Sequence, residues 1–429
     1  MPEKGTQIDF LKETEAIRDQ ITAWRRDLHR FPELDLQLPQ TKKYVTDVLS
    51  SLGVPYQTFE GHDGIVALLG SPNGTDARPA DGGDVAPGAG RKVVAPAAGR
   101  KVAAIRGDMD GLPVREETGL PFSSENSCMH ACGHDGHTAI LLGIARILKK
   151  HESELPGQVK LIFQPGEENL IGAKKMVADG VLEDPHVDRL FAVHIGSLGG
   201  RSEVGDVLVN RSNVFLASEC VEIRVHGRGG HAANPQLTVD PVPIAAEIIT
   251  ALQTLISREL KPGTVALISI TALESPTIAY NVISDSVTLY GGIRSKETDT
   301  QEFLFRRAEE LAQGIAAAHG GSAEFVRVYG APAVINDGAA VNDFLASAAK
   351  LLPEEKIRVI DSVNMGADDA AYFMNEVPGC YFYFCNAVPS ADGQVYPHHN
   401  SKFMIDDGML YQAAALLLQA AWDYLDDGC

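Results

Sequence analysis

Short apolar runs alternate with helical patterns through the first half of this chain, and no other feature constrains the fold as strongly. The runs are GIVALLG (64–70), KVAAIRGDMDGLPV (101–114), QVKLIFQPGEE (158–168) and DRLFAVHIG (188–196). Apolar residues at helical spacing lie between them, most clearly in GHTAILLGIARILKK (136–150). Strands that alternate with helices predict an α/β domain with a mainly parallel sheet.

Polar side chains that favour metals follow several of these predicted strands. Asp108 and Asp110 follow the second run, Glu167 and Glu168 follow the third, and His194 lies near the end of the fourth. Ligands of parallel sheets bind beyond the carboxyl ends of the strands. We therefore expect these side chains to share one functional site.

A second pattern begins near residue 212. Its order of predicted elements is β-α-β-β-α-β, which indicates a compact two-layer α+β unit. The α/β pattern resumes afterwards, so this unit reads as an insertion. The predicted domains are residues 1–211 and 329–429 for the α/β domain and 212–328 for the inserted domain.

Two other segments have a plain structural interpretation. Residues 9–52 carry a helical pattern that is broken at Pro32 and ends near Gly53. Residues 72–99 are rich in Gly, Pro and Ala, which predicts a surface insertion with little structure.

Composition excludes several classes of partner. The chain has 57 acidic against 37 Lys and Arg residues, a net charge of -20, which disfavours nucleic acid and anionic membranes. No apolar run reaches the ~18 residues of a membrane span, and the amino terminus lacks the apolar core of a signal peptide. Six cysteines in 429 residues are too sparse for a disulfide scaffold. We expect a cytoplasmic protein that acts on a small molecule.

The stretch CMHACGHDGH (128–137) concentrates metal-binding side chains immediately before a predicted helix. A zinc finger would need a second Cys/His pair at short spacing, and none follows. A Cys–His nucleophile pair remains open, although side chains two residues apart seldom make the required hydrogen bond. A catalytic metal site is the third interpretation.

Two further clusters bear on this choice. FQPGEEN (163–169) places adjacent carboxylates after an apolar strand, where one can bind a metal while its neighbour acts as a base. PHHNSKF (397–403) supplies His398 and His399 from a polar loop. Adjacent acidic residues usually lie in a solvated loop, and a single histidine is more often structural than a ligand. Several ligand-rich loops at strand ends nevertheless favour a metal centre.

Taken in order, the motifs resemble a family of metal-dependent amidohydrolases. The similarity is to the branch of co-catalytic metallopeptidases and aminoacylases that includes indoleacetyl-amino-acid hydrolases and hippurate hydrolases, with nitroanthranilate aminohydrolase as a relative. It extends from about residue 15 to 425 and rests on these segments: RGDMDGLP (106–113), ACGHDGHTAILLG (131–143), FQPGEE (163–168), AVHIG (192–196), GRGGHAANP (227–235), NVISD (281–285) and HNSKF (399–403).

The resemblance implies roles for individual residues. It implies that one or two divalent metal ions bind to Cys132, His134, Glu168, His194 and His399. Glu167 would be the general base, and Asp110 would support the metal ligands. Thiolate, imidazole and carboxylate together do not select one metal, so Mn²⁺, Zn²⁺ and Co²⁺ all remain candidates.

The resemblance also implies a role for the inserted domain as a lid and homodimerisation domain. His231 would contact the substrate and take part in catalysis, often across the dimer interface. Asn281 and Arg294 are further candidates for holding a substrate carboxylate.

The leading hypothesis is hydrolysis of a C–N bond in a small aromatic, carboxylate-bearing molecule, with an N-acyl or N-aroyl amino acid as the default substrate. An alternative is hydrolytic deamination of an electron-poor arylamine such as 5-nitroanthranilate, with release of ammonia. The chain departs from the branch at GADDAAYF (366–373), where Asp368 replaces Glu and Ala370 replaces Phe, and at Ser401, which replaces Pro. These departures leave the substrate open. A non-catalytic metal-binding protein on the same fold and a cysteine-nucleophile hydrolase are the remaining alternatives.

Overall fold

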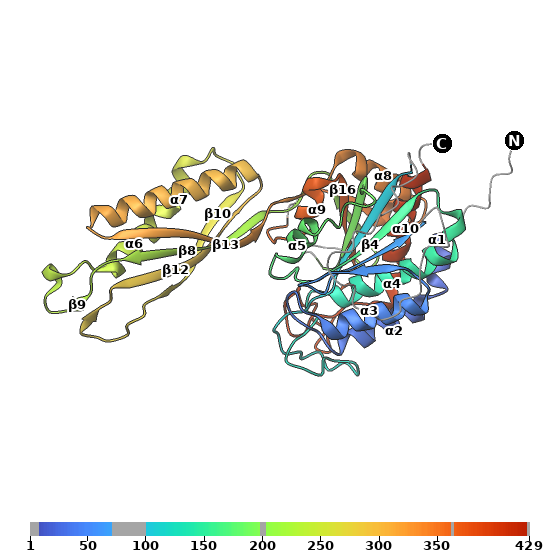
Figure 1. Cartoon of the computed structure of the whole chain (residues 1–429), viewed down its shortest axis with the longest axis horizontal. Helices are drawn as coiled ribbons and strands as arrows, with labels where there is room; N and C mark the ends of the chain where they lie inside the picture. The colour runs from blue at the N-terminus through green and yellow to red at the C-terminus, as the bar shows by residue number, and fades with distance from the viewer. Residues whose placement is uncertain (1–7, 71–99, 198–202, 362–363, 427–429) are drawn as a thin grey trace. The chain divides into compact units, whose positions relative to one another are not determined.

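The computed structural model describes residues 8–70, 100–197, 203–361 and 364–426. The Gly-, Pro- and Ala-rich segment at 72–99 lies outside the described residues. The chain divides into two compact units (Figure 1). The first comprises Met1–Val214, Ile335–Ser362 and Asp369–Cys429, and the second comprises Phe215–Val334 and Val363–Asp368.

The first unit is built on an eight-stranded sheet with the order β1-β2-β4-β3-β5-β16-β6-β15. Its strands are β1 (Tyr56–Thr58), β2 (Ile65–Leu69), β3 (Val102–Asp108), β4 (Gln158–Gln164), β5 (Arg189–Gly196), β6 (Val207–Asn210), β15 (Ile357–Ile360) and β16 (Gly379–Cys385).

The centre of this sheet is parallel, as the alternating pattern predicted. Strands β4, β3, β5 and β16 run in the same direction, whereas β2 is antiparallel to both β1 and β4 and β6 is antiparallel to β16. The loop 59–64 between β1 and β2 is too short for the crossover that a parallel pair requires. The predicted α/β fold is confirmed, and the sheet is mixed towards its edges.

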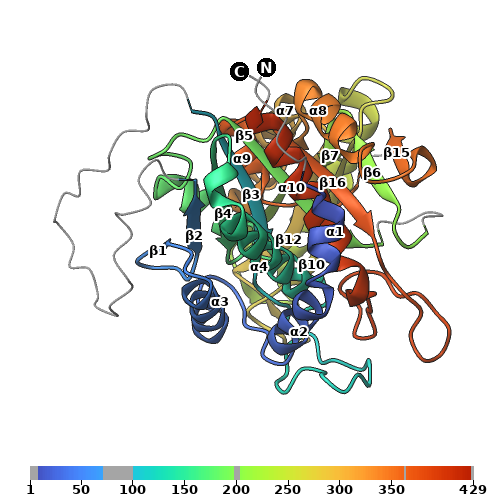
Figure 2. The same cartoon turned by 90° about the vertical axis from the view of Figure 1, so that its right-hand side faces the viewer.

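Helices flank this sheet. They are α1 (Phe10–Glu15), α2 (Arg18–His29), α3 (Pro39–Ser51), α4 (His134–Lys150), α5 (Gly172–Ala178), α8 (Gly338–Ala348), α9 (Ala371–Glu376) and α10 (Leu410–Asp426). Figure 2 shows α4 close to α2 and α10, which both contact it.

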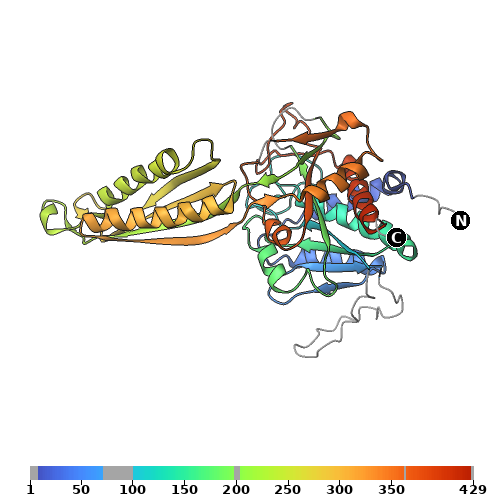
Figure 3. The same ribbon diagram turned by 90° about the horizontal axis from the view of Figure 1, so that it is seen from above.

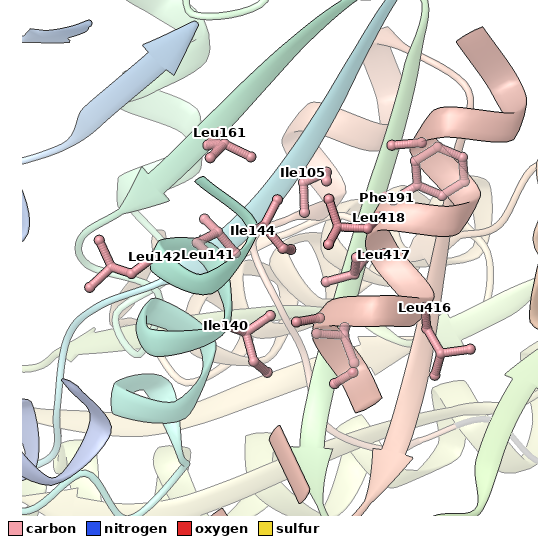
Figure 4. Packing of buried hydrophobic residues seen from close by; sticks show 14 of the residues in the cluster. Ile105, Ile140, Leu141, Leu142, Ile144, Leu161, Phe191, Leu416, Leu417 and Leu418 are labelled. Atoms are coloured by element: carbon pink, nitrogen blue, oxygen red, sulfur yellow. The ribbon is translucent and has the colours of Figure 1, made fainter. Parts of the chain in front are cut away.

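The core of the first unit forms where α4 and α10 pack on the central strands. Ile140, Leu141 and Ile144 of α4 are fully buried, and Figure 4 shows them beside Ile105 of β3 and Leu417 of α10. Each such side chain contributes about 1.5–3 kcal/mol when it is removed from water. This burial holds the first turn of α4, and thus the predicted metal-binding motif, in a fixed place.

The opposite face of β3 carries a buried charge. Ile105 points into the apolar core, so its neighbour Arg106 points to the other face. Arg106 is almost fully buried and pairs with Asp369, two residues before α9, and with Asp108 at the end of its own strand. The Arg106 ion pairs therefore connect the α9 side of the sheet to the strand ends.

The second unit has the predicted α+β order. Its elements are β8 (Ala217–His226), β9 (Gly230–His231), α6 (Pro241–Thr254), β10 (Ala266–Glu274), β11 (Val282–Ile283), β12 (Ser286–Ser295), α7 (Thr298–Ala318) and β13 (Ser322–Ala331). Two short strands, β7 (Asn213–Phe215) and β14 (Val334–Ile335), lie at its boundaries in the sequence.

Strands β10, β12, β8 and β13 form an antiparallel sheet in that order. Figure 3 shows α6 and α7 side by side along this sheet, and apolar residues of both helices share one core with it. The sheet order leaves β10 and β13 as edge strands. Within the described part of the chain, no helix combines the length and apolarity needed to cross a bilayer.

Candidate metal centre

The predicted metal-binding motif folds as a tight turn leading into α4. Gly133 has a φ of +89°, a left-handed backbone conformation that residues other than glycine rarely adopt. This turn separates Cys132 from His134, the first residue of the helix. The Cys132 thiol and one nitrogen each of His134 and His194 lie within 4.8 Å of one another.

Asp110 orients the His134 ring. The Nδ1–H of His134 donates to the Asp110 carbonyl at 3.0 Å, so the lone pair of Nε2 is available to a metal ion. That Nε2 lies 3.7 Å from Glu167 Oε2 and 3.9 Å from Glu168 Oε1. The Asp110 carboxylate also accepts the Glu168 N–H at 3.1 Å. Asp110 thus contacts two of the predicted ligands, as expected of a supporting residue.

His194 lies near the end of β5 and reaches the same place. Its Nδ1–H donates to the Ile195 carbonyl at 2.8 Å, and its Nε2 lies 3.4 Å from Cys132 Sγ. The ring is therefore held in the tautomer that a metal ligand requires.

Glu168 and His399 complete the cluster. His399 Nε2 lies 3.4 Å from Glu168 Oε2, and both residues group with Cys132. The backbone of His399 has a φ of +65°, and its N–H donates to the Ala131 carbonyl at 2.8 Å. A left-handed non-glycine residue costs on the order of 1–3 kcal/mol, a strain typical of functional sites.

His398, the neighbouring histidine, makes a different contact. Its Nε2–H donates to the Ile195 carbonyl at 2.9 Å. Among the described residues it belongs to none of the groups whose ligand atoms could share a metal ion. Of the two adjacent histidines, His399 is the one whose ring lies within reach of Cys132 and Glu168.

The charges of the cluster favour a cation. Burial raises the pKa of Glu168, and the carboxylates of Asp110 and Asp108 raise it further. Burial disfavours the charged form of His134, but Asp108, Asp110 and Glu168 outweigh this effect and raise its pKa. Burial and nearby imidazoles lower the pKa of His194. The carboxylates of Asp108 and Asp110 thus raise the pKa of both Glu168 and His134, and a divalent cation would offset this crowding of negative charge.

The donor set fits a divalent metal ion. His134 Nε2 and Glu168 Oε1 are both buried, and within the described residues neither has a hydrogen-bond partner. Buried polar atoms are nearly always satisfied, so each unsatisfied atom needs an explanation. The explanation offered by this spacing of thiolate, imidazole and carboxylate is that the two atoms bind a metal ion. These donors suit transition metals better than Ca²⁺ or Mg²⁺.

The substrate-binding candidates lie in the second unit and are described within it. His231 on β9 pairs with Val282 on β11, and the adjacent Ala232 N–H donates to the Asn281 carbonyl at 3.0 Å. His231 and Asn281 are therefore neighbours. Arg294 on β12 instead donates from Nη1 to the Met365 carbonyl at 2.5 Å.

The structure also identifies buried residues to which the sequence analysis gave no role. His137 donates to Asp108, and Arg106 forms an ion pair with the same carboxylate at 2.8 Å. An arginine within an otherwise apolar strand was the one available signal, because a buried charge must be paired. The importance of His137 was visible only as one more histidine of the 128–137 motif.

Similarity to known hydrolases extends along almost the whole chain. Residues 104–423 match Peptidase family M20/M25/M40. A Bacillus subtilis (strain 168) protein, provisionally named amidohydrolase YhaA, is 34% identical over 421 residues, which cover 97% of this chain and 98% of that protein. IAA-amino acid hydrolase ILR1-like 2 of Arabidopsis thaliana is 32% identical over 426 residues, or 98% of this chain and 88% of that protein.

A solved structure has the same fold. The Bacillus subtilis YXEP protein, described as a dinuclear metal binding peptidase from the M20 family, is 28% identical with a TM-score of 0.75. The match covers 96% of this chain and 99% of that one. The resemblance carried by the sequence motifs is confirmed: this chain is a hydrolase of peptidase family M20/M25/M40.

Proposed function

We propose that this protein hydrolyses the amide bond of a small N-acyl or N-aroyl amino acid with the help of one or two divalent metal ions. Mn²⁺ and Zn²⁺ are the first candidates, and Co²⁺ is a further one. The observation that carries the proposal is the buried pair of unsatisfied atoms, His134 Nε2 and Glu168 Oε1, inside a cluster of metal-binding side chains.

In this proposal Cys132, His134, Glu168, His194 and His399 hold the metal. When bound, such a cation lowers the pKa of a coordinated water from 15.7 toward about 7 and polarises the substrate carbonyl. The chain supplies the rest of the chemistry through side chains that orient the substrate and move a proton.

Glu167 is the proposed proton carrier. It is buried, and its carboxylate lies beside the His134 ring, where the ligand groups converge. It accepts a proton from the attacking water and returns it to the nitrogen of the leaving amine. One C–O bond forms, one C–N bond breaks, and the products are a carboxylate and an amine.

His231 is the proposed donor to the substrate. Its Nδ1 accepts the Ala233 N–H at 3.0 Å, so a neutral ring carries its proton on Nε2. That N–H can stabilise negative charge on the carbonyl oxygen. Asn281 and Arg294 are the proposed partners of the substrate carboxylate.

We further propose a homodimer through the inserted domain. Edge strands offer unpaired backbone groups to a second copy of the chain. Both edges of its four-stranded sheet also expose large apolar side chains, Leu273 on β10 and Val328 and Tyr329 on β13.

Peptide hydrolysis is the second candidate, because the family description and the YXEP protein both name peptidases. A substrate panel separates the possibilities. The metal-reconstituted enzyme is assayed with N-acetyl and N-aroyl amino acids, with dipeptides and with 5-nitroanthranilate, and amine and ammonia are measured separately.

Release of an amino acid from N-acyl or N-aroyl substrates is the expected result. Preference for dipeptides would replace the proposed substrate class while leaving the hydrolytic site intact. Release of ammonia from the nitroaromatic amine alone would establish deamination in place of amide hydrolysis.

A further inference from the structure

The backbone of Ile195 contacts three histidines beside the proposed metal centre. It follows His194 at the end of β5, and the Ile195 side chain is fully buried. Its carbonyl accepts the Nδ1–H of His194 at 2.8 Å and the Nε2–H of His398 at 2.9 Å. Its N–H donates to His137 Nε2 at 3.0 Å. Three histidines from three separate segments therefore meet at one backbone unit.

His137 has both ring nitrogens engaged. Because Nε2 accepts the Ile195 N–H, the ring proton is on Nδ1, from which it is donated to Asp108 at 2.5 Å. Asp108, His134 and His137 lie close enough together to suggest a metal site of their own. Neither nitrogen of His137 has a lone pair left for a metal, so hydrogen bonding accounts for this group.

His137 connects two elements that carry ligands. It lies one turn after His134 on α4, and the centroid of its ring is 5.5 Å from that of His134 and 5.0 Å from that of His194. Its bond to the Ile195 N–H thus holds the start of α4 against the end of β5.

His398 makes the matching connection to the third segment. It precedes the ligand His399, and its ring lies edge-on to the His194 ring with centroids 4.9 Å apart. The adjacent Gly196 permits this approach, because a Cβ atom at that position would lie only 2.2 Å from His398 Nε2. The loop that carries His399 is thereby held to the strand that carries His194.

We propose that His137 and His398 are positioning residues, which do not bind metal but hold His134, His194 and His399 in register through the backbone N–H and carbonyl of Ile195. This inference rests on the proposed metal centre. Outer partners of metal ligands typically change metal affinity by 10- to 100-fold. A loss of that size is expected when either connection to Ile195 is removed.

The test measures Mn²⁺ and Zn²⁺ affinity of the metal-free full-length protein by calorimetry, with the absorption spectrum of the Co²⁺ form as a second readout. His137→Gln keeps an acceptor where Nε2 was, and His137→Asn keeps a donor where Nδ1 was. We expect His137→Gln to stay within about threefold of the parent, and His137→Asn and His137→Ala to bind at least ~10-fold more weakly with altered Co²⁺ bands. His398→Ala should also bind metal at least ~10-fold more weakly. His398→Gln retains an N–H at the Nε2 position and should keep nearly the parental metal affinity.

His62→Ala is the matched control. His62 is also buried. Its Nδ1 accepts the Gly64 N–H at 3.0 Å and its Nε2 lies 3.0 Å from an Asp179 oxygen, and neither of these partners belongs to the cluster. The His62→Ala substitution should lower the melting temperature without changing the metal affinity. If His137 variants fail to fold, the His398 pair decides the question.

Parental affinity and Co²⁺ spectra in both His137→Ala and His398→Ala would overturn the positioning role and leave the metal centre standing. A parent protein that binds no metal would instead overturn the metal centre, and the positioning role with it.

Discussion

At the scale of single residues, the two adjacent glutamates have different surroundings. Both approach His134 Nε2, at 3.7 and 3.9 Å, but Glu168 alone also groups with Cys132 and His399. We expect Glu167→Gln to keep normal metal content while turnover falls at least ~10²-fold, because the amide cannot accept a proton. Glu168→Gln should lose metal, and excess metal should partly restore its activity. Metal analysis and steady-state kinetics measure both effects.

The two variants are each other's control, since they make the same change one residue apart. Normal turnover by Glu167→Gln would show that another group accepts the proton. Full metal occupancy in Glu168→Gln would remove Glu168 from the ligand set.

At the scale of elements, a buried charge cluster joins α2 to the start of α4. Asp135, next to the proposed ligand His134, lies 2.6 Å from Arg25 Nε and 2.7 Å from His29 Nδ1. His29 Nε2 lies 3.2 Å from Glu116 in the loop before the metal-binding motif. These contacts connect α2 and the loop at Glu116 to the predicted metal-binding motif.

The cluster predicts a loss of stability in acid. Burial opposes ionisation of Glu116, but hydrogen bonds from His29 and the Ser124 N–H outweigh it and lower its pKa to about 2. A depressed folded-state pKa stabilises the protein above the ordinary value of the group, and this contribution disappears as the pH falls towards 2. Glu116→Gln should therefore lower the free energy of unfolding near pH 6, and its difference from the parent should shrink between pH 5 and about 2. Urea unfolding across that range measures it.

Glu125→Gln is the control, because Glu125 is exposed and its ion pair with Arg30 spans 3.4 Å. The free energy of unfolding of Glu125→Gln should match that of the parent at every pH. A constant difference between Glu116→Gln and the parent would contradict the assigned ionisation.

At the scale of the whole molecule, the metal should contribute to stability. A ligand that binds only the folded state stabilises it by about 2.7 kcal/mol at a concentration 100 times its Kd. Chelation should therefore lower the melting temperature of the parent, and added Mn²⁺ or Zn²⁺ should restore it. His399→Ala should respond far less to both treatments. Equal melting temperatures with and without metal would contradict a folded-state metal site.

Association is a second property of the whole molecule. Light scattering should show a dimer for the parent, and a charge on the interacting edge, Leu273→Lys on β10 or Val328→Lys on β13, should shift it to monomer. Val359→Lys is the matched control, since Val359 is similarly exposed on β15, an edge strand of the eight-stranded sheet. A monomeric parent would contradict the proposed dimer. If both edge variants remained dimeric, the dimer interface would not lie on either edge of this sheet.

Much of this protein follows from local sequence. Periodicity predicted α4, the central parallel strands and the α+β order of the second unit, because burial of one face repeats at helical or strand spacing. The ligand-rich segments were visible as strand-end motifs, and the family that they indicate is confirmed. Short strands such as β6 (Val207–Asn210) and β15 (Ile357–Ile360) were missed, because four residues carry too little periodicity to detect.

Tertiary structure alone decided how those motifs combine. The sequence placed His398 and His399 side by side, but only the fold shows one ring turned to the Ile195 carbonyl and the other to Glu168. The pairing of Arg106 with Asp369 likewise spans 263 positions, beyond the reach of any local pattern. Sequence spacing determines which side chains share an element, whereas the packing of α4 and the 398–399 loop on β5 determines which atoms meet.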